Sequence, residues 1–139
     1  MGPVFIDTGY LIAVEWADDQ HHTAAAVHWR DYVRGGPRLV TTSFVLDEVV
    51  TFFVSRGRHA KAMEIADRFL ASPSVRLVHV DEELFVAAFE YLRKRPDKRF
   101  SLTDCVSFVL MTRLGIQKAL AFDSHFEQAG YIRLPPAPA

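Results

Sequence analysis

Short apolar runs alternate along the chain with longer stretches in which apolar residues recur every three or four positions. Runs of the first kind are typical of strands buried in a parallel sheet, and stretches of the second kind are typical of amphipathic helices. We expect strands at 3–6, 38–41, 75–80 and 118–122, with a fifth, edge strand at 132–134. The alternation predicts an α/β fold in three layers, with a central parallel sheet of four to five strands and helices on both faces.

Turn and cap residues set the expected limits of the helices. Helices are predicted at 10–16, 21–33, 43–55, 59–71, 81–94 and 101–114. Ser43, Asp81 and Ser101 stand at helix starts, where a short polar side chain can accept a backbone N–H bond. Gly115 follows the last of these helices, at the position where a left-handed residue commonly ends one.

The chain has the size of one domain. Its 139 residues, 50% of them hydrophobic, suffice for one sizeable core and are too few for two ordinary domains. We therefore predict a single domain over residues 1–134. Residues 135–139 read Pro-Pro-Ala-Pro-Ala, which cannot join a strand ladder, so we expect a flexible tail there.

Charge and cysteine content narrow the function classes. Sixteen Lys and Arg against seventeen Asp and Glu give a formal charge of −1, so any nucleic-acid contact must come from a local basic patch. One cysteine, Cys105, excludes an internal disulfide framework and suits a reducing cytoplasm. No apolar run approaches the roughly 18 residues of a membrane span, and no signal-peptide pattern opens the chain. We expect a soluble cytoplasmic protein.

Four acidic residues are candidates for a common site. Asp7 and Asp123 each follow an apolar strand, and ligands of an open parallel sheet bind beyond the carboxyl ends of its strands. Glu48 stands on an apolar helix row one turn from Phe44, where burial of an unpaired carboxylate would be costly. Asp104 lies in the first turn of its helix and is expected near the same sheet edge.

Each acid also has a structural explanation. Asp7, Asp104 and Asp123 stand near helix starts, where a carboxylate can serve as a cap, and Glu48 can be a solvated helix acid. Four acids in one cleft repel one another unless a cation is present, so their convergence favours a metal site. Hard oxygen ligands indicate Mg²⁺ or Mn²⁺.

Four sequence blocks resemble the motifs of PIN-domain ribonucleases. They are "FIDTGYLIA", "TTSFVLDEVVTFF", "SLTDCVSFVLMTRLGI" and "ALAFDSHFEQAGYIRL". No block alone is specific, but the four together, in this order and spacing, cover nearly the whole chain. Within that family, the length and the lack of a further domain are similar to the VapC-type toxins of toxin–antitoxin pairs.

The resemblance implies roles for individual residues. It assigns the metal ligands and catalytic acids to Asp7, Glu48, Asp104 and Asp123, with supporting hydroxyls at Thr8, Ser43 and Thr103. Where some relatives carry a further carboxylate after the fourth acid, this chain has Ser124 and His125. His125 is open to three interpretations: a metal ligand, a donor to the scissile phosphate, or a helix cap.

The resemblance also implies an activity and its partners. The expected reaction is metal-dependent hydrolysis of RNA phosphodiester bonds at restricted sites, leaving a 5′-phosphate. Expected partners are an RNA substrate, a VapB-type antitoxin and a second copy of the chain. Basic residues Arg95, Lys98 and Arg99 precede the Asp104 helix and are candidates for RNA contact, although a charged helix end is more often simply solvated.

One competing function stays open. A PIN-like fold without turnover would bind RNA or a protein partner, and such loss of function commonly replaces one of the four acids, which are all present here. A haloacid-dehalogenase-like phosphatase would need a second Asp two positions after Asp7, where this chain has Gly9.

Overall fold

The computed structural model describes residues 2–138, which form one five-stranded sheet and the helices around it. The strands are β1 (Val4–Ile6), β2 (Leu39–Thr42), β3 (Val75–Val78), β4 (Lys118–Leu120) and β5 (Ile132–Leu134). The helices are α1 (Thr8–Glu15), α2 (His22–His28), the π-helix η1 (Trp29–Val33), α3 (Ser43–Ser55), α4 (His59–Ala71), α5 (Glu82–Arg93), α6 (Leu102–Leu114) and α7 (His125–Gln128).

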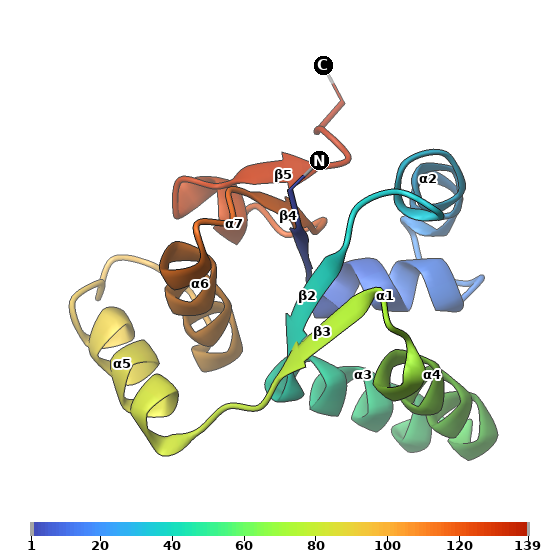
Figure 1. Ribbon diagram of the computed structural model, residues 1–139, viewed down its shortest axis with the longest axis horizontal. Helices are drawn as coiled ribbons and strands as arrows, with labels where there is room; N and C mark the ends of the chain where they lie inside the picture. The colour runs from blue at the N-terminus through green and yellow to red at the C-terminus, as the bar shows by residue number, and fades with distance from the viewer. Residues whose placement is uncertain (1, 139) are drawn as a thin grey trace.

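All strand pairs are parallel, in the order β3-β2-β1-β4-β5. The first strand of the chain therefore lies at the centre, with β2 on one side and β4 on the other. Figure 1 shows α5 and α6 on one side of the strands and α1, α2 and α4 on the other. The predicted three-layer α/β fold is confirmed, including the fifth strand at the edge.

The sheet is most deeply buried at its centre. Every residue of β1 and β2 is buried, whereas β3 and β5 at the edges are only partly covered. Helices cover both faces of the central strands, which explains why β1 is a continuous apolar run rather than an alternating one. Asp7, which follows β1, thus lies at the buried centre of the sheet.

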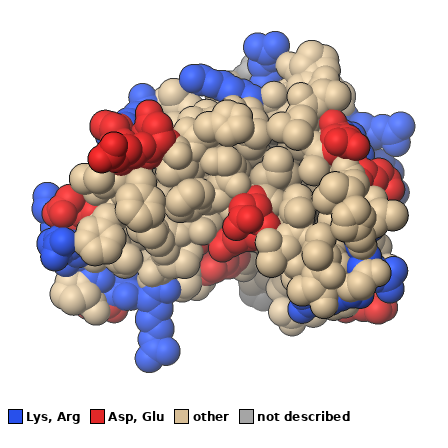
Figure 2. All heavy atoms as spheres, turned by 90° about the horizontal axis from the view of Figure 1, so that it is seen from below, with Lys and Arg blue, Asp and Glu red and all other residues tan. Residues whose placement is uncertain are grey.

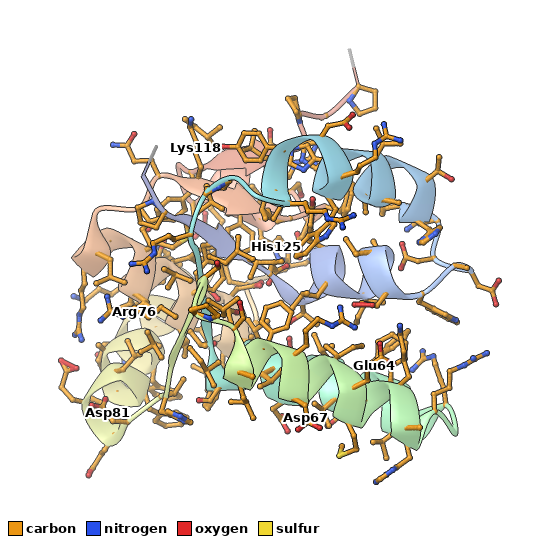
Figure 3. All side chains as sticks on the ribbon, turned by 45° about the vertical axis from the view of Figure 1, so that its right-hand side comes forward. Glu64, Asp67, Arg76, Asp81, Lys118 and His125 are labelled. Atoms are coloured by element: carbon orange, nitrogen blue, oxygen red, sulfur yellow. The ribbon has the colours of Figure 1, made fainter. Side chains whose placement is uncertain are left out.

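Figure 3 distinguishes the two ends of the sheet. Lys118, which begins β4, lies at the opposite end of the molecule from Asp81, which follows β3. The direction in which strands are added to the sheet reverses at β1, because β2 lies on one side of β1 and β4 lies on the other. At such a switch point, the helices that follow neighbouring strands leave a crevice beyond the carboxyl ends.

Several predicted caps and element limits are wrong, and the third strand ends at Val78 rather than at residue 80. Thr42, rather than Ser43, caps α3, because the Thr42 hydroxyl accepts the N–H of Val45 at 3.2 Å. The fourth strand ends at Leu120 instead of Phe122, and Asp123 consequently lies in a bend beyond the ladder. In addition, the predicted helix over 21–33 divides into α2 and η1.

The helix limits predicted from Asp81 and Gly115 are confirmed, whereas the flexibility of the predicted tail stays a prediction. Asp81 caps α5 by accepting the N–H of Leu84 at 2.8 Å, and Gly115 ends α6 in the left-handed region with φ of 69°. Residues 135–138 form no helix or strand, and residue 139 of the predicted tail lies outside the described residues. Between residues 2 and 138, no helix combines the length and apolar character that crossing a membrane requires.

Candidate active site

Asp7 stands at the end of β1 and at the start of α1. It is only 6% exposed, and its side chain makes no capping hydrogen bond to α1. Gly9 stands two residues later, and a Cβ at Gly9 would lie 4.0 Å from the Asp7 carboxylate. The capping interpretation therefore fails for Asp7, and its buried charge requires another explanation.

Glu48 reaches the same strand end from α3. The Thr8 hydroxyl, one residue after Asp7, donates to Glu48 Oε1 at 2.6 Å. This contact joins the first turn of α1 to the second turn of α3. Glu48 itself is exposed, so the burial cost that its apolar row suggested does not arise.

Asp104 combines a structural role with a place in the cluster. Its Oδ2 accepts the backbone N–H of Ser101 at 3.1 Å, and its own N–H donates to the Ser101 hydroxyl at 2.9 Å. This reciprocal pair is a capping box, in which two otherwise unpaired N–H groups are satisfied. Asp104 is 7% exposed, and the same Oδ2 lies 2.9 Å from His125 Nδ1.

Asp123 and His125 form a local unit after β4. The backbone N–H of His125 donates to Asp123 Oδ1 at 2.8 Å, and His125 Nδ1 lies 3.1 Å from Asp123 Oδ2. One ring nitrogen thus contacts carboxylates from two elements, α6 and the bend before α7. Both contacts bear on His125, which the sequence left open as a metal ligand, a donor to the scissile phosphate or a helix cap.

The pKa of Asp7 reflects the charges of the other three acids. The pKa of Asp7 is raised to about 8, mainly by burial and next by the negative charge of Asp104, with smaller contributions in the same direction from Asp123 and Glu48. A hydrogen bond from the Thr8 backbone opposes them. The charges of the other three acids therefore all act on Asp7, as expected where carboxylates converge.

The donor groups suit a divalent cation. Ligand atoms of Asp104, Asp123 and His125 all lie within 4.8 Å of one another, and Asp7 adds a buried carboxylate beside them. Viewed from the carboxyl end of the strands, the molecule shows an acidic patch near the middle of the face, in a hollow between two lobes (Figure 2). A cation here would offset the repulsion that raises the pKa of Asp7.

The three hydroxyl residues differ in what they contact. Thr8 alone among them donates to one of the four acids within residues 2–138. The Ser43 hydroxyl accepts the N–H of Val80 at 2.9 Å and so fixes the chain after β3. Thr103 is partly buried, and its carbonyl accepts the Ser107 hydroxyl at 3.0 Å.

Two residues that sequence analysis gave no site role support the acids. Ser101 holds Asp104 through the capping box, and the spacing Ser-x-x-Asp is the signal that identifies it. Thr41 is fully buried and donates to the carbonyl of Ile6 at 2.9 Å, which fixes the strand end just before Asp7. No sequence pattern indicates the Thr41 contact.

Some of the basic side chains before α6 already make contacts within the protein, which leaves fewer of them to bind RNA. The Arg95 guanidinium lies 3.4 Å from the centre of the Tyr91 ring and donates to the Tyr91 carbonyl at 2.9 Å. Lys98 lies 4.0 Å from Asp97, and Arg99 is exposed. Arg99 and Lys98 are therefore better placed than Arg95 to meet a phosphate.

Comparisons with known proteins match nearly the whole chain. The PIN domain model matches residues 4–131. The 23S rRNA-specific endonuclease VapC20 of Mycobacterium tuberculosis is 34% identical over 133 residues, which cover 96% of this chain and 98% of the relative. The crystal structure of VapC20, described as a sarcin–ricin loop cleaving toxin, superposes with a TM-score of 0.86 at 33% identity, over 96% of this chain and 99% of that one.

Proposed function

Because this chain belongs to the PIN-domain family, we propose that it is an endoribonuclease that acts as the toxin of a toxin–antitoxin pair. The observation that carries the proposal is the meeting of four carboxylates from distant parts of the chain at one sheet edge, with the buried Asp7 among them. An acid that folding buries at such a cost is typical of a functional site.

We assign the catalytic acids and metal ligands to Asp7, Glu48, Asp104 and Asp123. Bound Mg²⁺ or Mn²⁺ would supply a water activated for attack and would stabilise negative charge on the leaving 3′ oxygen. Thr8 orients Glu48, and Ser101 orients Asp104, through the hydrogen bonds described above. The acids are thus held in place before substrate arrives, which is the main contribution a protein makes to such a site.

We propose ribosomal RNA as the first substrate to test. VapC20 is named for cleavage of 23S rRNA, and it matches this chain over nearly the whole length of both. Arg99 and Lys98 lie at the loop that leads into α6, where they can contact the phosphates that flank the scissile bond. In this proposal, Ser43 and Thr103 remain supporting residues through their hydroxyl groups.

We further propose a VapB-type antitoxin and a homodimer, acting in the cytoplasm where ribosomal RNA is found. A disordered antitoxin segment that folds over the acidic cleft and inserts an Arg would pair with the clustered carboxylates. For self-association, apolar side chains are exposed on α3, α4 and α5, including Val54, Met63 and Phe89. Light scattering after size exclusion measures the oligomeric state directly.

An RNA-cleavage assay tests the proposed activity. Purified protein is incubated with total ribosomal RNA and Mg²⁺ or Mn²⁺, with EDTA as the metal-free control. The test variant is Glu48→Gln, and the matched control is Asp47→Asn, which removes the adjacent exposed acid. We expect discrete products that EDTA and Glu48→Gln abolish and Asp47→Asn leaves unchanged. RNA binding without products under every condition would instead support a binding module.

A further inference from the structure

His125 contacts two of the proposed metal ligands with one nitrogen. Its Nδ1 lies 2.9 Å from Asp104 Oδ2 and 3.1 Å from Asp123 Oδ2. The side chain is 24% exposed, and its ring packs edge-on against Phe100, with the ring centres 5.5 Å apart. The ring is therefore held in one orientation, with Nδ1 directed at the carboxylates.

The helix that starts at His125 does not account for this orientation. α7 is four residues long, and the Asp123 carboxylate caps it through the backbone N–H of His125, at 2.8 Å. Any residue except proline would supply that N–H. The ring is thus free of a capping role, and its position between α6 and the bend after β4 needs a separate explanation.

The spacing of the three donor atoms fits one metal shell. Adjacent ligands of an octahedral ion with bonds of about 2.1 Å are separated by roughly 3 Å. The two contacts of His125 Nδ1 have this separation, and the donor atoms of Asp104, Asp123 and His125 form a compact group. The group offers two carboxylate oxygens and one imidazole nitrogen.

We propose that His125 binds the catalytic cation through Nδ1 and that this nitrogen makes the site prefer Mn²⁺ to Mg²⁺. The inference rests on the proposed function, because it concerns the cation of the same site. Mg²⁺ selects oxygen ligands and water, whereas first-row transition ions also bind imidazole. A neutral nitrogen in place of a further carboxylate therefore adds binding energy for Mn²⁺ that Mg²⁺ does not gain.

Pulsed electron paramagnetic resonance of bound Mn²⁺ tests ligation without any activity measurement. A coordinated histidine nitrogen gives a ¹⁴N coupling, which ¹⁵N-histidine labelling changes to a ¹⁵N coupling. We expect this coupling in the unmodified protein and its loss in His125→Asn. Bound Mn²⁺ with no nitrogen coupling in the unmodified protein would overturn the proposal.

Affinity measurements test the selectivity. An Asn at position 125 can still donate an N–H to the carboxylates but does not supply an imidazole nitrogen, so it separates ligation from mere positioning. We expect His125→Asn to weaken Mn²⁺ binding at least about tenfold, with a smaller loss for Mg²⁺. His59→Asn, at an exposed position at the start of α4, is the matched control and should change neither affinity.

The outcomes separate this inference from the proposed function. Equal losses for both ions, or none, mean that the ring only positions the acids, and the inference fails while metal-dependent cleavage stands. If the protein cleaves RNA in EDTA, the metal-dependent function fails and the inference fails with it. Metal-free thermal melts of His125→Asn and His59→Asn verify that both variants are folded.

Discussion

Asp7 and Asp104 both lie at the start of a helix and are almost equally buried, but their surroundings differ. Asp104 is hydrogen-bonded through the capping box at the start of α6 and also contacts His125 of α7. Asp7 makes no cap, and its pKa is raised by burial and by neighbouring acids. One carboxylate therefore contributes to the fold, and the other costs stability in the metal-free protein. The difference shows that a helix-start acid can be identified as functional only by its contacts.

The largest expected effect is on catalysis at Asp7. Asp7→Asn should lower the single-turnover rate of RNA cleavage by about 10³-fold or more, the scale on which loss of one member of a catalytic unit acts. In the same variant, the metal-free free energy of unfolding should rise near neutral pH, because residue 7 no longer has to take up a proton for the protein to fold.

Asp104→Ala tests the second acid in the comparison between Asp7 and Asp104. It should lose cleavage to a similar degree, but its free energy of unfolding should fall, because the capping box is lost. Urea unfolding in EDTA measures both changes. Equal signs for the two variants would contradict the distinction between the two acids.

The second effect is on the pH dependence of stability. Folded Asp7 has a pKa of about 8 against an ordinary value of 3.8, so the folded state holds its proton more tightly than the unfolded state does. The free energy of unfolding in EDTA should therefore fall as the pH rises from about 4 to about 8, by on the order of a few kcal/mol.

Urea unfolding across this pH range, with and without Asp7→Asn, measures that dependence. The substitution should flatten the profile, and saturating Mn²⁺ should restore stability to the unmodified protein at high pH. An unmodified protein whose metal-free stability rises over the same range would show that Asp7 is already ionised.

The third effect concerns the link between α1 and α3. Thr8→Val removes the hydroxyl that donates to Glu48 at 2.6 Å and should slow cleavage roughly 10- to 100-fold, in line with about 1.5–3 kcal/mol for a hydrogen bond to a charged group. Thr8→Ser keeps the hydroxyl and should retain most of the rate. If serine and valine behave alike, the hydrogen bond does not orient Glu48.

The smallest effect is on the cap of α6. Ser101→Ala should lower the free energy of unfolding by about 1 kcal/mol and also reduce cleavage, because Asp104 loses a hydrogen bond that fixes it. Asp81→Ala is the matched control. It removes the cap of α5, a hydrogen bond between Asp81 and Leu84 that involves none of the four acids. It should cost similar stability in urea unfolding with no loss of cleavage rate.

Sequence patterns predicted most of the fold because they depend on local physics. Apolar runs identified all five strands, and cap residues such as Asp81 and Gly115 set the helix limits. The errors arose where tertiary contacts decide the outcome. Ser43 looked like a cap but bonds to Val80 across the sheet edge, and the strand pairing of β4 stops before the apolar run does.

The site was only partly predictable for the same reason. Asp7 and Asp123 follow strands, so topology alone indicated that they lie at one edge. The contact of Thr8 with Glu48 spans 40 positions of the chain, and that of His125 with Asp104 spans 21, so neither has a local signal. Periodicity placed Glu48 on an apolar row, but Glu48 is exposed while Phe44 and Phe52 on the same row are partly buried.

The central position of β1 has a consequence for biosynthesis. Its partner β4, and the acid at residue 123 that follows, come from the far end of the chain. A nascent polypeptide that still holds the residues from 118 onward inside the ribosomal tunnel lacks β4, β5 and Asp123. The proposed active site can therefore assemble only after these residues have emerged, long after Asp7 has left the tunnel.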